Sequence, residues 1–107
     1  MQQNSNKILL VESEGFLKNN LQEALNFYGY EVATAKSAEN GIENLKNETY
    51  DAVISDHDLI DMRGEYFLLW AKNQRRIPVV ILMVSTGEVE KYKKYNSEGI
   101  DVVIEKP

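Results

Sequence analysis

The stretch Asp51-Ala52-Val53-Ile54-Ser55-Asp56 decides the fold of this chain. Its centre is apolar, and it ends on a carboxylate that a polar loop follows. A short apolar run between polar residues is typical of a strand that is buried on both faces of a parallel sheet. The pattern therefore predicts a buried strand with Asp56 at its carboxyl end.

Similar runs lie on either side of this stretch, and helical patterns alternate with them. We predict strands at 7–11, 30–35, 51–55, 78–84 and 100–104, and helices at 16–28, 37–46, 65–74 and 88–98. Ser37 is a candidate cap for the second helix, and Gly29 stands where a left-handed residue ends the first. Because parallel strands need crossover connections, the pattern predicts an α/β fold with a doubly wound, five-stranded parallel sheet of order 2-1-3-4-5.

Size and composition predict one cytoplasmic domain that comprises residues 1–107, with a flexible start at 1–6. The chain has 107 residues, of which 43% are hydrophobic, and this composition suffices for one ordinary core. No apolar run approaches the roughly 20 residues that span a bilayer, and Met1 to Asn6 lack a signal-peptide pattern. The absence of Cys excludes disulfides and thiolate metal sites.

The charge balance indicates the kind of partner. The formal net charge is −5, whereas binding to a phosphate backbone needs a concentrated basic surface. We therefore expect a protein or a metal ion as partner, with no nucleic acid bound by this domain and no membrane. A homodimer is also compatible with the sequence.

Polar side chains follow several of the predicted strands and should meet at one edge of the sheet. In doubly wound sheets, ligands bind beyond the carboxyl ends of the strands where the winding reverses, here between the first and third strands. Carboxylate oxygens in that place suit Mg²⁺ or attack on a phosphoryl group, and an ammonium can pair with phosphoryl oxygens. The candidates are Glu12, Glu14, Asp56, Ser85, Thr86 and Lys106.

Each of these side chains also has a purely structural interpretation. Acidic residues at strand ends often solvate a loop or cap a helix, so no single one of them establishes a site. His57 is interpreted as an exposed loop residue. The cluster of Tyr66, Phe67 and Trp70 is assigned to helix packing, and the lysines at 91, 93 and 94 to a solvated face. Only the convergence of the strand ends favours function at Asp56.

From Lys7 to Pro107 the chain resembles the receiver domain of bacterial two-component response regulators. The matching segments are Ile8 to Glu14, Ala52 to Asp56, Met62-Arg63-Gly64, Ile77 to Val80, and Lys106-Pro107. The resemblance implies a flavodoxin-like fold and a phosphoryl group accepted on Asp56 from a histidine kinase or phosphotransfer protein. It also implies a magnesium ion held by Glu12, Asp56 and the backbone carbonyl of Asp58, a contact from Lys106 to the phosphoryl group, and a cis Lys106-Pro107 bond.

The chain departs from the family pattern at several positions. Ser13 stands where a second acidic metal ligand is usual, which predicts weak Mg²⁺ binding, and Ile60 replaces a usual proline. Counting back from Lys106 places Val84 at the usual switch hydroxyl, whereas a shift of one residue places Ser85 there. Val103 stands at the usual aromatic position, and the fifth helix of the family is absent from the sequence.

Three functions follow as alternatives. The first is a phosphoacceptor domain of a phosphorelay, a switch more than an enzyme, with an output partner that the sequence does not name. The second is a pseudo-receiver that binds partners without phosphorylation, which Ser13, Val84 and Val103 favour. The third is a phosphatase with an aspartate nucleophile, because Asp56-His57-Asp58 matches an Asp-x-Asp signature, although that motif normally follows the first strand.

Overall fold

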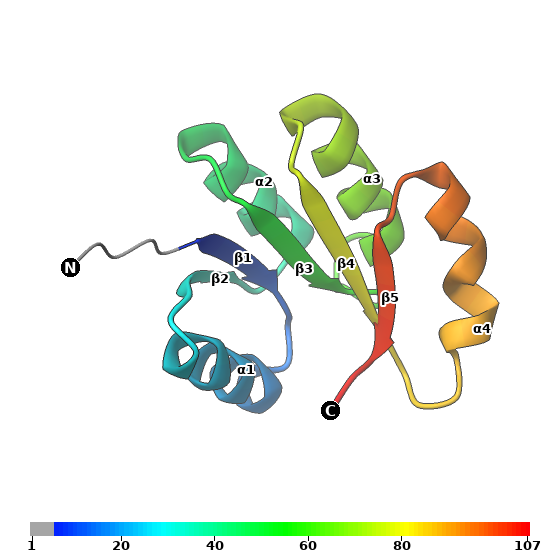
Figure 1. Ribbon diagram of the computed structural model, residues 1–107, viewed down its shortest axis with the longest axis horizontal. Coiled ribbons are helices and arrows are strands. Elements are labelled where there is room, and N and C mark those ends of the chain that lie inside the picture. The colour runs from blue at the N-terminus through cyan, green and yellow to red at the C-terminus, as the bar shows by residue number, and fades with distance from the viewer. Residues whose placement is uncertain (1–5) are drawn as a thin grey trace.

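The predicted α/β fold and strand order are confirmed. The computed structural model describes residues 6–107, so the flexible start predicted at 1–6 lies almost wholly outside the described residues. The parallel sheet has the order β2-β1-β3-β4-β5 (Figure 1). The strands of the sheet are β1 (Lys7–Val11), β2 (Glu31–Ala35), β3 (Ala52–Asp56), β4 (Val79–Val84) and β5 (Val102–Glu105). The helices are α1 (Gly15–Phe27), α2 (Ala38–Asn47), α3 (Gly64–Arg75), α4 (Val89–Tyr92) and the 3₁₀ helix η1 (Lys93–Glu98).

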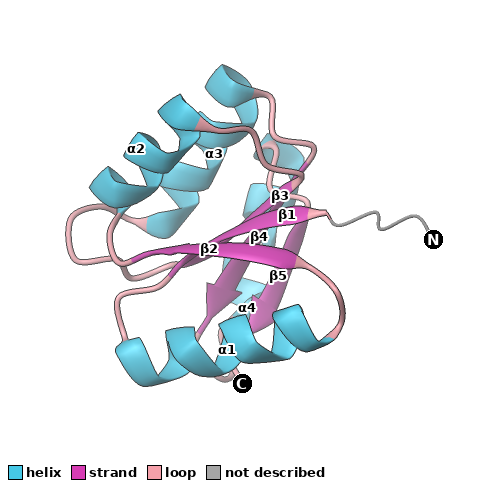
Figure 2. Ribbon diagram, turned by 90° about the vertical axis from the view of Figure 1, so that its left-hand side faces the viewer, coloured by secondary structure: helices cyan, strands magenta, loops and turns pink. Residues whose placement is uncertain are grey.

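The helices cover the two faces of the sheet unequally. Figure 2 shows α2 and α3 on one side of the sheet and α1 on the other. The main core lies on the side of α2 and α3, where buried side chains from α2, α3, α4 and η1 pack on the sheet. In contrast, α1 has no fully buried residue. One face is therefore packed, and the other, which α1 alone covers, is open.

The strand register decides which face each side chain joins. In β3, Val53 packs into the main core, whereas Ile54 lines a cavity on the open face together with Leu25 of α1. Side chains alternate along a strand and parallel partners share a face. Leu10 pairs with Ile54, so Glu12 and Asp56, each two residues further on, belong to the open-face set.

The predicted helix at 88–98 is only partly an α-helix. Its α-helical part is the four-residue α4, and η1 continues it. Polar side chains compete for the backbone here, since the Asn96 amide donates to the carbonyls of Ile100 and Asp101 and the Ser97 hydroxyl donates to that of Lys94. Such local bonds offer the chain an alternative to α-helical pairing.

Two aromatic residues depart from their expected places. Tyr30 is not part of β2, because its N–H donates to the Leu25 carbonyl and closes the turn after α1. Tyr66 is exposed, so only its neighbours Phe67 and Trp70 take part in the predicted packing.

The cis Lys106-Pro107 bond that the resemblance implied is wrong. No peptide bond among residues 6–107 is cis. The trans isomer is intrinsically preferred before proline by about 0.5–1 kcal/mol. In this conformation Pro107 lines a cavity with Leu17 and Leu21 of α1.

Candidate functional site

Asp56 and Lys106 meet at the carboxyl edge of the sheet. The Asp56 side chain is 4% exposed, and Lys106 Nζ lies 2.9 Å from its Oδ1 atom. The Lys106 N–H donates to the Val84 carbonyl at 2.8 Å, which places Lys106 directly after β5. Asp56 and Lys106 form an ion pair without an aligned hydrogen bond, since Asp56 Oδ1 accepts no hydrogen bond from a described residue. A buried acceptor oxygen thus faces a cation.

Glu12 brings a second buried carboxylate to the same edge. Its N–H donates to the Ala35 carbonyl at 2.9 Å and extends the ladder between β1 and β2. Its Oε2 accepts from the Glu14 N–H at 3.1 Å, while Oε1 has no partner among the described residues. Burial raises the pKa of Glu12, the Glu14 N–H opposes this, and the Asp56 charge raises the pKa further. The position favours a cation beside Glu12.

The donor set fits a magnesium ion with an incomplete protein shell. No three His, Cys, Asp or Glu side chains gather to hold a metal ion within residues 6–107. Mg²⁺ does not require such a cage, because it binds through one or two carboxylates plus waters and phosphate oxygens. The unpartnered oxygen of Glu12 and the Asp56 carboxylate meet that requirement.

Three other sequence candidates have different surroundings. Glu14 caps α1, because its carboxylate accepts from the N–H groups of Phe16 and Leu17. Ser13 is half-buried between Glu12 and this cap. Asp58 is exposed, and its backbone pairs with that of Arg63 in an isolated antiparallel bridge that closes the loop after β3.

The two positions considered for the switch hydroxyl, Val84 and Ser85, differ in their surroundings. Val84 ends β4 as a fully buried core residue, so the end of this strand carries an aliphatic side chain without a hydroxyl. Ser85 follows the strand and is exposed, and its Oγ lies 3.5 Å from His57 Nε2. Thr86 is exposed as well. We found no contact of Ser85 with Asp56 among the described interactions.

Two residues that position the acceptor loop were not among the predicted site residues, although Gly64 lies in a segment that resembles the receiver family. Gly64 begins α3 and donates its N–H to the His57 carbonyl at 2.9 Å, and a Cβ atom there would overlap the Asp56 carbonyl. Asp61 accepts from the N–H groups of Ala38 and Glu39, both at 2.9 Å. Burial raises the pKa of Asp61, but these donors outweigh it and hold the pKa below its ordinary value. The loop is thereby tied to the start of α2.

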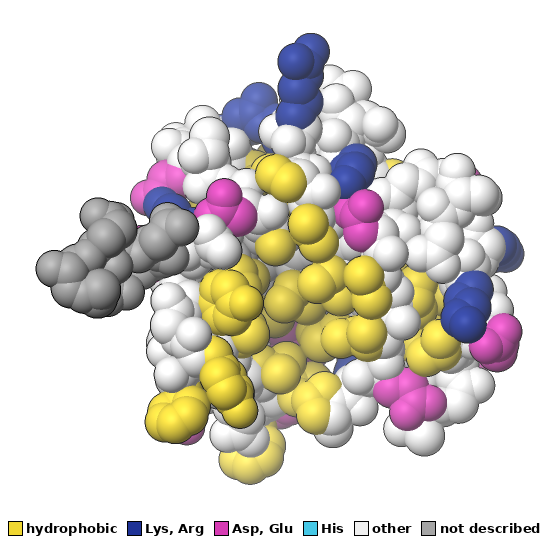
Figure 3. Space-filling view, viewed as in Figure 1, with side chains coloured by type: hydrophobic (Ala, Val, Ile, Leu, Met, Phe, Trp, Pro, Cys, Tyr) yellow, Lys and Arg dark blue, Asp and Glu magenta, His cyan; other side chains and the backbone are white. Residues whose placement is uncertain are grey.

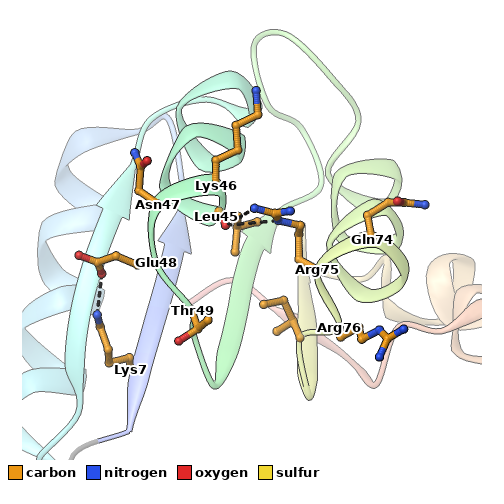
Figure 4. Close-up of a pocket in the computed structure, with 10 residues that line it drawn as sticks. Lys7, Leu45, Lys46, Asn47, Glu48, Thr49, Gln74, Arg75 and Arg76 are labelled. Atoms are coloured by element: carbon orange, nitrogen blue, oxygen red, sulfur yellow. Dashed lines mark hydrogen bonds and ion pairs between the residues drawn. The ribbon is translucent and has the colours of Figure 1, made fainter.

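A large cavity lies at the opposite, amino end of the strands. It has a volume of about 690 Å³ and lies between the ends of α2 and α3 (Figure 4). Two of the cationic side chains that line it are engaged, since Lys7 pairs with Glu48 and Arg75 donates to the Leu45 carbonyl at 2.9 Å. Cations near helix C-termini complement the helix dipoles. The cavity is distant from Asp56 along the strands and is not the candidate site.

The comparisons with known proteins agree with this geometry. Residues 8–107 match the family described as the response regulator receiver domain. This chain belongs to that family. The receiver domain is 32% identical over 102 residues to the transcriptional regulatory protein QseB of Haemophilus influenzae, and the match covers 94% of this chain and 46% of QseB. It is 30% identical to the response regulator protein FleR of Pseudomonas aeruginosa, and this match covers 94% of this chain and 21% of FleR.

Solved structures give the same answer for the fold. The receiver domain superposes with a TM-score of 0.87 on a CheY-like receiver domain protein from Methanospirillum hungatei, at 28% identity, covering 97% of this chain and 83% of that one. The domain spans less than half the length of the two curated relatives named above. Receiver domains generally bind Mg²⁺ at an acidic pocket. No helix within residues 6–107 has the length and apolar character to cross a membrane.

Proposed function

We propose that this receiver domain accepts a phosphoryl group on Asp56 from a histidine kinase or phosphotransfer protein. One observation carries the proposal: the buried Asp56 carboxylate lies 2.9 Å from Lys106 Nζ, beside a second buried carboxylate with an unpartnered oxygen. Similarity to response regulators supports a kinase and an output domain as partners. The reaction modifies the domain itself, so its role is that of a switch and not of an enzyme that turns over a substrate.

The residues divide the phosphotransfer between them. An Asp56 carboxylate oxygen attacks phosphorus, a bond forms between them, and the bond from phosphorus to the donor breaks as the leaving group departs with its electrons. The Lys106 ammonium pairs with the phosphoryl oxygens. Glu12 and Asp56, with the Asp58 carbonyl, would hold Mg²⁺, which supplies positive charge to the transferring group.

The test uses acetyl phosphate as donor, with acetate as leaving group. With Mg²⁺ present, we expect intact-protein mass spectrometry to detect one added phosphoryl group. Asp56→Asn should abolish the addition, because it removes the nucleophile. Asp58→Asn is the matched control and should largely preserve it, because this exposed side chain lies two residues further along the loop. An unmodified wild-type protein at saturating Mg²⁺ would contradict the proposal.

The metal role has a separate test. Ser13 supplies no charge, so Mg²⁺ affinity should be weak, and Ser13→Asp should strengthen it through an added anionic oxygen. Isothermal titration with Mg²⁺ measures the change. Equal affinities of the two proteins would place Ser13 outside the metal shell.

A phosphorylation-independent pseudo-receiver is the second candidate. The observation in its favour is the buried Val84 at the place of the usual hydroxyl, since a valine cannot donate a hydrogen bond to a phosphoryl oxygen. Beryllofluoride with Mg²⁺ separates the two functions, because it binds only a competent acceptor site. An NMR spectrum that beryllofluoride leaves unchanged would favour the pseudo-receiver.

A further inference from the structure

The residue after the acceptor is joined rigidly to the sheet. The His57 N–H donates to the Met83 carbonyl of β4 at 2.9 Å, and its own carbonyl accepts from Gly64 at 2.9 Å. The backbone of His57 is therefore held on both sides by the elements that hold Asp56. A change at Asp56 reaches the His57 side chain without an intervening flexible segment.

The His57 side chain bridges to the helix that follows β4. Its Nδ1 lies 3.3 Å from the Tyr92 hydroxyl, and its Nε2 lies 3.5 Å from Ser85 Oγ. The His57 and Tyr92 rings are 5.2 Å apart between centroids. Because Tyr92 is buried and ends α4, the imidazole connects the end of β3 with both the lead-in loop and the last turn of this helix.

Tyr92 extends the connection into the next turn. Its ring stacks on that of Tyr95 in η1, with centroids 6.2 Å apart and an interplanar angle of 27°. Tyr95 is buried in the same core. The inner edges of α4 and η1 thus rest on two tyrosines, of which the first contacts His57.

This helix is the element of the domain that should move most easily. The α4 helix has four residues, Glu88 gives it no side-chain cap, and it continues as a 3₁₀ helix. Elements with few regular backbone hydrogen bonds open at low free energy.

Two positions of the usual route between the acceptor and this region carry aliphatic side chains in this chain. Val84 offers no hydroxyl, and Val103 offers only an aliphatic side chain that packs on the core. Among the described residues, His57 is the polar side chain that contacts both Ser85 and Tyr92.

We propose that His57 is the positioning residue that transmits phosphorylation of Asp56 to α4 through Tyr92. The inference rests on the proposed phosphoacceptor function. A phosphoryl group carries about −1.5 to −2 charge and three strong acceptor oxygens, in place of the single negative charge of the Asp56 carboxylate. It competes for the Ser85 hydroxyl, whose 3.5 Å contact with His57 is at the long limit of a hydrogen bond. Once Ser85 turns away, the imidazole and the Tyr92 hydroxyl rearrange, and α4 follows.

The test measures separately whether Asp56 is modified and whether Tyr92 and α4 respond to that modification. Beryllofluoride and Mg²⁺ are added to the full chain labelled with ¹⁵N and with ¹³C-tyrosine, while mass spectrometry after acetyl phosphate measures acceptor chemistry in parallel. In the wild type, the Tyr92 ring and the α4 amides should shift. In His57→Ala, modification of Asp56 should persist, and these shifts should fall at least about threefold. Tyr92→Phe keeps the ring but lacks the hydroxyl, so it should lose the response similarly, and adding His57→Ala should cost nothing more.

Glu90→Ala is the control, because the Glu90 side chain is 86% exposed on the same helix. It should retain the wild-type response. Full modification with an undiminished shift of the α4 amides in His57→Ala and in Tyr92→Phe would overturn this inference alone, as would a wild type whose Tyr92 and α4 signals do not respond to modification. A wild type that acetyl phosphate leaves unmodified would overturn the proposed function, and this inference with it.

Discussion

The packed face and the open face of the sheet differ in how much they constrain the molecule. On the packed face, Phe67 of α3 is fully buried, whereas Phe16 of α1 on the opposite side is 76% exposed. Hydrophobic side chains gather visibly over the middle of the open face (Figure 3). The acceptor carboxylates belong to the open-face set, yet α3 from the packed face holds their loop. One face therefore supplies rigidity, and the other supplies the reactive groups.

The largest expected contrast is between the two phenylalanines. Phe67→Ala should destabilise the domain by about 3–5 kcal/mol, because it leaves a cavity in a closed core. Phe16→Ala should change the free energy of unfolding by less than about 0.5 kcal/mol, since its ring is exposed. Urea denaturation measures both values. Equal losses would mean that α1 packs as tightly as α3 and would break the contrast between the faces.

Two helix-initial glycines sharpen the contrast at the edge of the sheet. Gly64→Ala should cost about 1–3 kcal/mol through overlap with the Asp56 carbonyl, and it should lower phosphorylation as the loop shifts. Gly15→Ala in α1 meets no atom within 4 Å and should be neutral or stabilise by up to about 1 kcal/mol. Thermal unfolding and acetyl phosphate labelling of the two variants check this pair. A harmless Gly64→Ala would show that α3 does not constrain the acceptor.

Substitution of Glu12 tests whether the buried carboxylate at the carboxyl edge of the sheet destabilises the folded protein. Folding raises the pKa of Glu12 above its ordinary value of 4.5. The free energy of unfolding therefore falls as the pH rises from 4.5 through the pKa of Glu12 in the folded protein. Glu12→Gln should therefore stabilise the protein at pH 7 by about 1 kcal/mol while it weakens Mg²⁺ binding. Unfolding curves at pH 4 and pH 7 provide the comparison. A destabilised variant at pH 7 would mean that the carboxylate is already satisfied.

Asp61 gives the smallest effect and concerns the packed side of the acceptor loop. Folding lowers the pKa of Asp61 below its ordinary value of 3.8. The ionised carboxylate therefore stabilises the folded protein fully above pH 3.8, and this stabilisation is lost as the pH falls through the pKa of Asp61 in the folded protein. Asp61→Ala should cost about 0.5–1 kcal/mol at pH 7 through loss of the contacts with α2. The difference from wild type should shrink in acid. Asp58→Ala is the control, and an Asp61→Ala loss that is independent of pH would argue against a charged contact.

The order of apolar runs and helical patterns was sufficient to predict the sheet. β1 was placed with its observed bounds, and Ser37 was correctly assigned as a cap, because strand burial and capping depend on neighbours in the chain. The fourth helix was less predictable, since side-chain bonds of Asn96 and Ser97 compete with a weak helical pattern. Glu14 could not be assigned either, because a carboxylate after a strand suits a metal site and a helix cap equally.

The sequence by itself determined the α/β class, the strand order and the likeness to receiver domains, since these depend on local periodicity and crossover rules. It also placed Asp56 and Lys106 at strand ends. Only the tertiary structure decided that these two form an ion pair, that Glu12 keeps an unpartnered oxygen, and that Ser85 and Tyr92 meet at His57. These contacts join residues that are distant in the chain, and their geometry depends on how the helices pack.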